Sequence, residues 1–349
     1  MNLCDFTTVG LGGPAREFVR ARGEAEVLAA VRDAKRRGTQ LFVLGGGSNL
    51  VVADEGVDAV VLRLEDGSLR ADERAGGALV EVGAGAVWDD WVALAVERGW
   101  SGIECLSGIP GQVGSTPIQN VGAYGQEVAG TITRVRVLDR ARETIEWLPA
   151  AACDFGYRTS RFKGEGHARQ LVLAAEFALG RGVPCTAPYP ELERALGQTG
   201  EERTLAHIRQ TVLALRRSKS MLLDPADENG RSCGSFFTNP IVGPDVAARV
   251  AARVGEPPPA FPQADGRVKL AAAWLIERAG LTRGTRVGNV GLSSRHTLAL
   301  VAHAGATARE LVSFAWTVRD RVETQFGVRL VPEPVFWGFS RLEDGLPAL

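Results

Sequence analysis

The chain has 349 residues, of which 45% are hydrophobic and 23% charged, and its formal net charge is −1 at pH 7. A chain of this length usually divides into two or three domains. The near-zero charge argues against a surface for nucleic acid or an anionic membrane. No apolar run approaches the roughly 20 residues that span a bilayer, so we expect no membrane insertion.

The cysteines are odd in number and scattered, without a CxxC pair. This pattern argues against a disulfide framework or a zinc site, and it suits a reducing compartment. Residues 1–5 lack the charged-then-apolar layout of a secretory signal. The sequence therefore predicts a cytoplasmic protein without a metal site. The cysteines are Cys4, Cys105, Cys153, Cys185 and Cys233.

The first region predicts a small α/β unit. Residues 24–37 have helical spacing of apolar residues, with acids at the start, bases at the end and Gly38 as the stop. A short buried strand at 41–44 leads directly into a glycine-rich turn at 45–50. This order favours a ligand at the carboxyl end of the strand. Further strands are predicted at 51–52 and 57–64.

A second region starts near residue 68. Apolar runs predict its strands. Helical periodicity predicts two helices, and Gly99 ends the first of them. Three prolines predict a loop at 182–192. The predicted strands are 78–83, 134–139 and 171–179, and the predicted helices are 88–98 and 205–217.

A third region starts near residue 221. Residues 224–239 are polar and contain glycine, which predicts an ordered loop with a function. A helix is predicted at 268–279, and a capping box at 307–310 opens a long amphipathic helix that ends at Gly327. Alternating apolar residues with two prolines predict that 328–339 is an edge strand or an arm that packs back on the body.

The most informative stretch is 102–125, where glycines recur among hydroxyl and amide residues without one basic side chain. Glycine lets the backbone turn sharply and approach a ligand closely. Consecutive N–H groups in such turns form anion-binding hollows. We interpret this stretch as a loop around the pyrophosphate of a large cofactor.

Two common nucleotide motifs fail. The run at 83–88 lacks the third glycine of the dinucleotide fingerprint, and no Lys-Ser/Thr pair follows 111–115 as a P-loop requires. The two remaining glycine-rich loops, at 45–50 and 108–125, could hold an elongated ligand from both ends. Ordinary tight turns are the alternative, more plausible for 45–49 than for the longer stretch.

The run from 108 to 125 reads Gly-Ile-Pro-Gly-Gln-Val-Gly-Ser-Thr-Pro-Ile-Gln-Asn-Val-Gly-Ala-Tyr-Gly. It resembles the flavin-binding core of UDP-N-acetylenolpyruvoylglucosamine reductases, the UDP-N-acetylmuramate dehydrogenases of peptidoglycan precursor synthesis. The likeness continues in the expected order through almost the whole chain. The other similar segments are 45–50, 157–163, 234–240, 262–272 and 330–335.

The resemblance implies an α+β fold of the vanillyl-alcohol-oxidase type. Two FAD-binding subdomains, 1–67 and 68–220, would precede an α+β substrate-binding domain at 221–333. The tail, 334–349, would pack back on the first subdomain. The two flavin loops contain no His, so we expect non-covalent FAD. The expected cofactor-binding residues are Gly45, Gly46, Gly47, Ser48, Asn49, Leu50, Gly108, Ile109, Pro110, Gly111, Gly114, Ser115, Pro117, Gln119, Asn120, Gly122, Ala123 and Tyr124.

The resemblance also implies a reaction in two halves. NADPH reduces FAD and leaves, and the enolpyruvyl ether of UDP-N-acetylglucosamine then receives the hydride at its vinyl carbon. A proton completes UDP-N-acetylmuramate. By their match to the family, Arg158 would stabilise the developing anion, Ser235 would donate the proton, and Glu333 would polarise the substrate carboxylate. Each also has an alternative without a catalytic role: Arg158 could be a surface arginine, Ser235 a loop hydroxyl and Glu333 a solvated acid.

Substrate contacts are expected from five further side chains. Tyr189 matches a tyrosine that closes over the uridine diphosphate, and Lys219 and Asn239 are candidates for the diphosphate and sugar. Tyr157 is equally a packed aromatic, Tyr189 could be a surface tyrosine and Lys219 a solvated base. Thr238 and His296 depart from the family pattern, which often has Lys and an amide there. The substrate set is Tyr157, Tyr189, Lys219, Asn239 and His296.

Two other functions compete with this interpretation. One is an oxidase or dehydrogenase of the same fold that acts on a sugar lactone or alcohol. The other is an inactive nucleotide-binding module. The segments around Arg158, Ser235 and Glu333 argue against the first, and the intact glycine loops argue against the second. The sequence indicates a small-molecule substrate and no specific protein partner.

Overall fold

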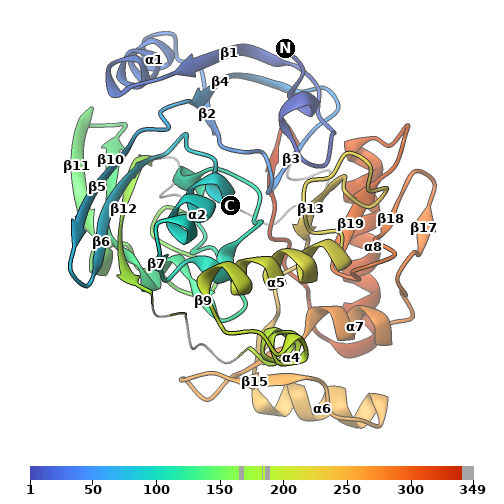
Figure 1. Cartoon of the computed structure of the whole chain (residues 1–349). Coiled ribbons are helices and arrows are strands. Elements are labelled where there is room, and N and C mark those ends of the chain that lie inside the picture. The colour runs from blue at the N-terminus through green and yellow to red at the C-terminus, as the bar shows by residue number, and fades with distance from the viewer. Residues whose placement is uncertain (165–168, 183, 185–188, 340–349) are drawn as a thin grey trace.

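The computed structural model describes residues 1–164, 169–182, 184 and 189–339. The fold is mixed α+β, as expected, and its sheets follow one another along the chain (Figure 1). Part of the predicted loop at 182–192 and residues 340–349 of the tail lie outside the described residues. Within the described ranges, no helix is both long and apolar enough to cross a membrane.

The first part is a three-stranded parallel sheet with the order β1-β4-β2. Helix α1 buries Val27, Val31 and Ala34 against it, as its periodicity predicts. The same cluster includes Leu138 and Leu171 of the next sheet, so this core joins the two sheets. The elements are η1 (Leu3–Phe6), β1 (Ala15–Ala21), α1 (Glu24–Arg36), β2 (Leu41–Leu44), β3 (Leu50–Val52) and β4 (Val57–Leu64).

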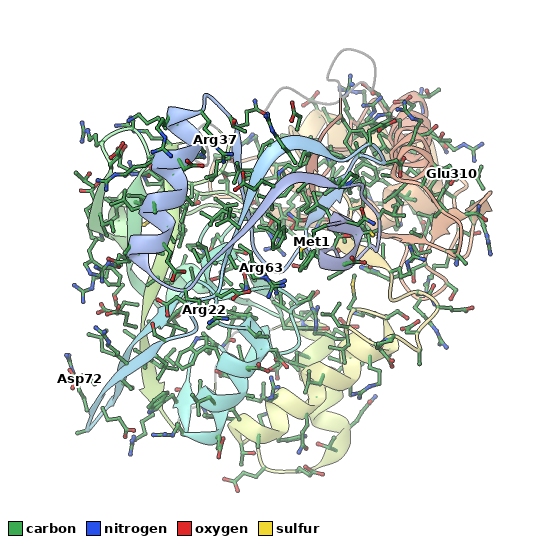
Figure 2. All side chains as sticks on the ribbon, turned by 90° about the horizontal axis from the view of Figure 1, so that it is seen from above. Met1, Arg22, Arg37, Arg63, Asp72 and Glu310 are labelled. Atoms are coloured by element: carbon green, nitrogen blue, oxygen red, sulfur yellow. The ribbon has the colours of Figure 1, made fainter. Side chains whose placement is uncertain are left out.

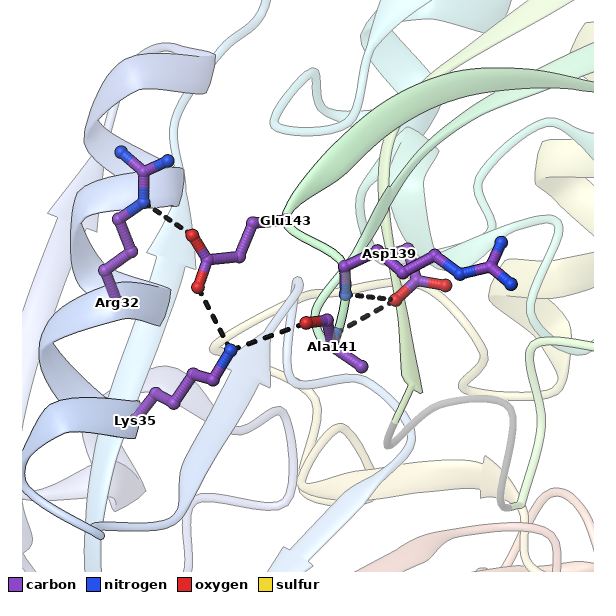
Figure 3. Close-up of polar contacts among 6 residues, drawn as sticks. Arg32, Lys35, Asp139, Ala141 and Glu143 are labelled. Atoms are coloured by element: carbon purple, nitrogen blue, oxygen red, sulfur yellow. Dashed lines mark hydrogen bonds and ion pairs between the residues drawn. The ribbon is translucent and has the colours of Figure 1, made fainter.

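Ion pairs join α1 to the second sheet (Figure 3). The Glu143 carboxylate accepts hydrogen bonds from Arg32 Nε at 2.8 Å and Lys35 Nζ at 3.1 Å, and Lys35 also reaches the Ala141 carbonyl at 3.4 Å. Exposed ion pairs of this kind contribute little to the free energy of folding. Seen from above, Asp72 and Glu310 mark opposite edges of the molecule (Figure 2).

The second part is an antiparallel sheet with the order β11-β10-β12-β6-β5, and β7 pairs with β12. Its core is aromatic: Trp88 and Trp91 of α2 pack on Phe177 with ring centroids 6.0 and 5.9 Å apart. Its strands are β5 (Leu69–Arg74), β6 (Gly77–Gly83), β7 (Trp100–Ser101), β8 (Gly122–Ala123), β9 (Gln126–Glu127), β10 (Ile132–Asp139), β11 (Thr144–Pro149) and β12 (Gln170–Arg181). Its helices are α2 (Trp88–Glu97), η2 (Glu104–Leu106), η3 (Val113–Ser115), η4 (Val128–Gly130), η5 (Ala150–Ala152), α4 (Pro190–Thr199) and α5 (Leu205–Ser218).

The third part holds the sheet β13-β19-β18-β17 and the smaller sheet β14-β16-β15. The long helix α8 opens on the predicted capping box between Thr307 and Glu310 and ends at Gly327. Its elements are β13 (Ser232–Ser235), β14 (Ile241–Val242), α6 (Pro244–Val254), β15 (Ala260–Pro262), β16 (Val268–Leu270), α7 (Ala272–Arg278), β17 (Arg286–Val287), β18 (Val290–Leu292), β19 (Ala299–Ala302), α8 (Ala308–Phe326) and β20 (Val335–Trp337).

Three sequence predictions need correction. Residues 268–270 are strand β16 rather than helix, because they pair with β14 and β15, and the helix α7 starts only at Ala272. The predicted loop at 224–239 contains β13, which pairs with β19. Helix α4 begins at Pro190, inside the predicted loop at 182–192, since proline fits the first helical turn.

Residues 335–337 of the tail lie against the first part of the chain. Strand β20 pairs in parallel with β3, and Trp337 stacks on Phe42 with centroids 4.8 Å apart. The carboxy-terminal strand therefore completes the core beneath the first sheet. Because Glu333 lies two residues before this strand, the pairing also fixes where Glu333 lies.

A side chain of the first part caps the longest helix of the third. The Asp54 carboxylate accepts hydrogen bonds from the N–H groups of Ala308 at 2.7 Å and Arg309 at 3.0 Å. These groups belong to the first turn of α8, which has no acceptors within the helix and carries the positive end of its dipole. The neighbouring Glu55 makes an exposed ion pair with Arg309, at 3.2 Å.

We expect Asp54→Ala to lower the free energy of unfolding by about 1–2 kcal/mol, because it removes two charge-assisted caps. Urea unfolding followed by tryptophan fluorescence measures the change. The matched control is Glu55→Ala, which removes the same charge one residue later and should leave the midpoint unchanged. Equal losses in both variants would show that net charge, and not the cap, is responsible.

Candidate active site

The predicted catalytic residues and most of the predicted cofactor residues line one cavity of about 1110 Å³. Ordinary small-molecule pockets have roughly 300–1,000 Å³, so this cavity is large enough for a dinucleotide-sized ligand. Its walls come from all three parts of the fold. They comprise the two glycine-rich loops, the segment 220–223, strand β13 and the chain from 331 to 339.

The two glycine-rich loops interlock. A Cβ added to Gly46 would lie 2.5 Å from Gly111 Cα, so only glycine permits this contact. Ser48 Oγ donates to the Pro110 carbonyl at 2.9 Å, and Asn49 Nδ2 donates to Gln119 Oε1 at 3.0 Å. The loops therefore form a single structure, although some 60 residues separate them in the sequence.

The first loop presents unused donors. No hydrogen bond within the described part of the chain uses the N–H groups of Gly46, Gly47 or Ser48. The Gly47 backbone is held in the left-handed region with φ of 64° and is anchored by the Thr8 N–H, which donates to its carbonyl at 3.1 Å. Consecutive free N–H groups next to a cavity bind phosphate oxygens, so these residues fit the pyrophosphate of FAD.

Some predicted cofactor residues stand behind the cavity wall and support it. The Asn120 amide donates to Glu127 at 2.8 Å and to the Gly156 carbonyl at 3.1 Å. Tyr124 meets Tyr189 edge to face at 5.3 Å. The supporting residues are Gly46, Gly108, Gly114, Pro117, Asn120 and Tyr124. The residues that line the cavity are Gly45, Gly47, Ser48, Asn49, Leu50, Ile109, Pro110, Gly111, Ser115, Gln119, Gly122 and Ala123.

Arg158, Ser235 and Glu333 come together at this cavity from distant positions. Arg158 Nε lies 3.4 Å from Glu333 Oε1, and Arg158 Nη2 donates to the Gly122 carbonyl at 2.8 Å. The Glu333 N–H donates to the carbonyl of Phe236, the residue after Ser235, at 2.8 Å. The guanidinium, the hydroxyl and the carboxyl thus face the same ligand space.

Lys163 belongs to this group, although the sequence analysis assigned it no role. It lines the cavity, and its Nζ donates to the Arg158 carbonyl at 2.9 Å. Arg158 has a positive φ of 54°, an uncommon conformation for a residue with a side chain, so this bond helps hold a strained backbone. Its position at the end of the 157–163 segment was the available signal.

The charges of this group are buried. The Glu333 side chain is only 13% exposed, and burial raises the pKa of its carboxyl, although Arg158 and Lys163 oppose the shift. Burial lowers the pKa of Lys163, and the Glu333 charge partly restores it. The site therefore favours a protonated Glu333 more than water does.

The predicted substrate residues form two groups. Tyr157 and Asn239 lie beside the catalytic residues: the Tyr157 ring is 5.6 Å from the Arg158 guanidinium, and Lys269 Nζ lies 4.4 Å above it. Asn239 lies close to Tyr157, and its Oδ1 accepts a hydrogen bond from the Ala272 N–H at 2.9 Å. Asn239 therefore also caps helix α7.

The second group does not line the cavity. Lys219 Nζ pairs with Glu191 Oε2 at 2.5 Å and lies 5.7 Å from the Tyr124 ring, against which Tyr189 packs. Burial, with help from the Lys219 charge, lowers the pKa of His296 to about 4, so this imidazole is neutral at pH 7. Tyr189, Lys219 and His296 thus gather around α4 and α5.

Comparison with known proteins shows which family has this sequence and fold. Residues 224–337 match the family described as the C-terminal domain of UDP-N-acetylenolpyruvoylglucosamine reductase. Residues 15–148 match the family described as an FAD binding domain. The chain is 50% identical over 347 residues to the UDP-N-acetylenolpyruvoylglucosamine reductase of Thermobifida fusca, with 97% of each chain covered. It is 46% identical to that of Mycobacterium marinum, with 96% of this chain and 94% of the relative covered.

A solved structure agrees. The crystal structure of the UDP-N-acetylenolpyruvylglucosamine reductase of Thermus caldophilus superimposes with a TM-score of 0.65 and 26% identity, covering 97% of both chains. Sequence and fold thus agree over nearly the whole length. The chain therefore belongs to the UDP-N-acetylenolpyruvoylglucosamine reductase family, and it combines an FAD-binding domain with the C-terminal domain of that family.

Proposed function

We propose that this protein uses NADPH, through bound FAD, to reduce the enolpyruvyl ether of UDP-N-acetylglucosamine to UDP-N-acetylmuramate, a peptidoglycan precursor. The observation that carries the proposal is the meeting of Arg158, Ser235 and Glu333 at a cavity bordered by two glycine-rich loops. The names of the relatives support the same reaction. Bound FAD supplies the hydride transfer, from NADPH to the vinyl carbon of the substrate.

Arg158 and Glu333 act on the substrate carboxylate. Hydride addition to the vinyl carbon moves negative charge toward that carboxylate, and a guanidinium fork matches its two oxygens. An ionised Glu333 would repel the same group, whereas a protonated one donates a hydrogen bond to it. The raised pKa of Glu333 supports the protonated form.

Ser235 donates the proton that completes the product. It lies on β13 and lines the cavity, two residues before Phe237 turns into the core. A serine hydroxyl is a very weak acid, so it transfers a proton only to a strongly basic carbon, which the charged intermediate of this reaction provides. The protonated carbon is the one next to the carboxylate.

The remaining substrate residues would bind the nucleotide end. We propose that Tyr189 closes over the uridine diphosphate, that Lys219 exchanges Glu191 for a phosphate oxygen, and that His296 lies beside this contact as a neutral donor or acceptor. Tyr157 and Asn239 would contact the sugar near Arg158. Their separation into two groups suits an elongated substrate whose reacting end enters the cavity first.

Purification and turnover test the proposal. The protein should bind FAD and appear yellow, and it should oxidise NADPH rapidly only when the enolpyruvyl substrate is present. NADH in place of NADPH tests the choice of reductant. A colourless protein that takes up no FAD, or a yellow one that oxidises a sugar lactone but ignores the enolpyruvyl ether, would refute this function.

The substitution Ser235→Ala should separate the two half-reactions. Reduction of FAD by NADPH should keep its rate, whereas reoxidation by substrate should slow by roughly a hundredfold or more, because the proton donor is gone. Anaerobic stopped-flow absorbance measures both. Ser218→Ala, at the exposed end of α5, is the matched control and should change neither rate. Unchanged reoxidation in Ser235→Ala would remove Ser235 from the mechanism.

The titration of Glu333 should appear in the reoxidation rate. Its pKa is raised by burial, so the active protonated form is complete at low pH and is lost as the pH rises through that raised pKa. Glu333→Gln keeps a hydrogen-bond donor that does not titrate, so the decline should vanish. Glu333→Ala should lose both the donor and the rate. A decline that persists in Glu333→Gln would assign it to another group.

A further inference from the structure

The segment that precedes β1 joins the first glycine-rich loop to the strand that carries Ser235. Thr8 makes both contacts. Its N–H donates to the Gly47 carbonyl at 3.1 Å, and its hydroxyl Oγ1 donates to the Ser232 carbonyl at 2.6 Å. Thr8 also lines the cavity. A single residue therefore bonds the loop that fits the pyrophosphate of FAD to the strand of the proposed proton donor.

Strand β13 needs such a partner because it is the edge strand of its sheet. The order of that sheet is β13-β19-β18-β17, and β13 pairs with β19, where Ser232 lies opposite Val301. An edge strand presents backbone groups on the side where no strand follows. Ser232 is only 7% exposed, and the Thr8 hydroxyl supplies a donor for its carbonyl. Loss of that donor would leave a buried acceptor unsatisfied, which is unfavourable unless the strand moves.

The residues on either side of that carbonyl also reach the first part of the chain. Arg231 Nη2 donates to the Gly10 carbonyl at 3.0 Å. Cys233 Sγ donates to the Leu50 carbonyl at 3.5 Å. Three consecutive residues, 231–233, are thus bonded to the first part. Since Ser235 follows two residues later, its position depends on these contacts.

The contact of residues 6–8 with the loop is tight. A Cβ added to Gly47 would lie 1.8 Å from the Phe6 carbonyl oxygen and 3.0 Å from Thr7 Cα. Because close-packed groups transmit displacements, a shift of Thr8 would reach the loop. The Thr8 hydroxyl has one hydrogen, which it donates to the Ser232 carbonyl, so it has none left for a phosphate oxygen. This inventory suits a role in positioning rather than in ligand binding.

We infer that Thr8 is a positioning residue, whose hydroxyl holds the strand of Ser235 in place relative to the loop that holds FAD. Proton transfer requires the Ser235 hydroxyl within hydrogen-bond reach of the reacting carbon, and a misplacement of about 1 Å can slow such a step by roughly a hundredfold. Reduction of FAD by NADPH does not use Ser235, so Thr8 acts on one half-reaction. The inference rests on the proposed function for this consequence, whereas the link itself can be tested without a ligand.

The link is tested first, by amide hydrogen exchange of the full chain without ligand. Thr8→Val removes the hydroxyl but keeps the branched side chain and the backbone N–H, and Thr8→Ser retains the hydroxyl. The matched control is Thr7→Val, since the Thr7 hydroxyl donates to the Leu11 carbonyl at 2.9 Å within the same segment. In Thr8→Val, exchange should become at least about threefold faster in peptides that cover 232–236 and 45–49. The other two variants should match the wild type in these peptides.

The consequence is tested on the FAD-bound enzyme by anaerobic stopped-flow absorbance. In Thr8→Val, reoxidation by the enolpyruvyl substrate should slow by about tenfold, and its solvent deuterium isotope effect should increase because proton delivery becomes slower. Reduction by NADPH and the dissociation constant of FAD should each change by less than about threefold. Thr8→Ser should restore the rate of reoxidation. Thr8→Ala, which also lacks the hydroxyl, serves if the valine variant does not fold.

Two results would overturn the inference. A large loss of FAD affinity in Thr8→Val without faster exchange at 232–236 would make Thr8 a direct ligand of the cofactor. Equal effects in Thr7→Val and Thr8→Val would assign them to general loosening of the segment. Faster exchange in Thr8→Val, in a protein whose wild type takes up no FAD, would support the link and refute the proposed function instead.

Discussion

The side chain of Asn49 connects the three parts of the fold at the site. Its Nδ2 donates to Gln119 Oε1 at 3.0 Å and to the backbone carbonyl of Glu333 at 3.2 Å. The backbone carbonyl of Asn49 accepts a hydrogen bond from the Val335 N–H at 2.9 Å. These bonds fix the second glycine loop and the carboxy-terminal strand relative to the first loop. Because Glu333 lies within this arrangement, its carboxyl oxygen Oε1 comes to 3.4 Å from Arg158 Nε.

The charges of the site follow from this arrangement. Two cations, Arg158 and Lys163, flank one carboxyl that is almost fully buried, so a net positive region faces the ligand space. A positive, desolvated region attracts an anionic ligand and stabilises charge that develops during reaction. Lys163 contributes twice, since its hydrogen bond to the Arg158 carbonyl also holds the left-handed backbone on which the guanidinium depends.

Local sequence patterns predicted local structure well and tertiary structure less well. The periodicity of α1 and the capping box of α8 involve only near neighbours, and both are confirmed. Strand β16 was missed because its pairing partners lie elsewhere in the chain. Asn120 and Tyr124 were expected to contact the cofactor, yet both have positive φ and their side chains support the loop.

Polar groups without a hydrogen-bond partner occur both at the cavity and away from it. Other buried side-chain nitrogens also lack partners, among them those of Arg134 and Trp100. Arg134, however, pairs with Glu176 at 2.5 Å and stacks on Trp147 at 4.4 Å, so its charge is compensated within the protein. Neither residue lines the cavity, whereas Gly47 and Ser48 do, and their N–H groups have no partner among the described residues. The unpartnered N–H groups of the first loop therefore lie where a ligand can complete them, which is the expected place for a fold to break its own local rules.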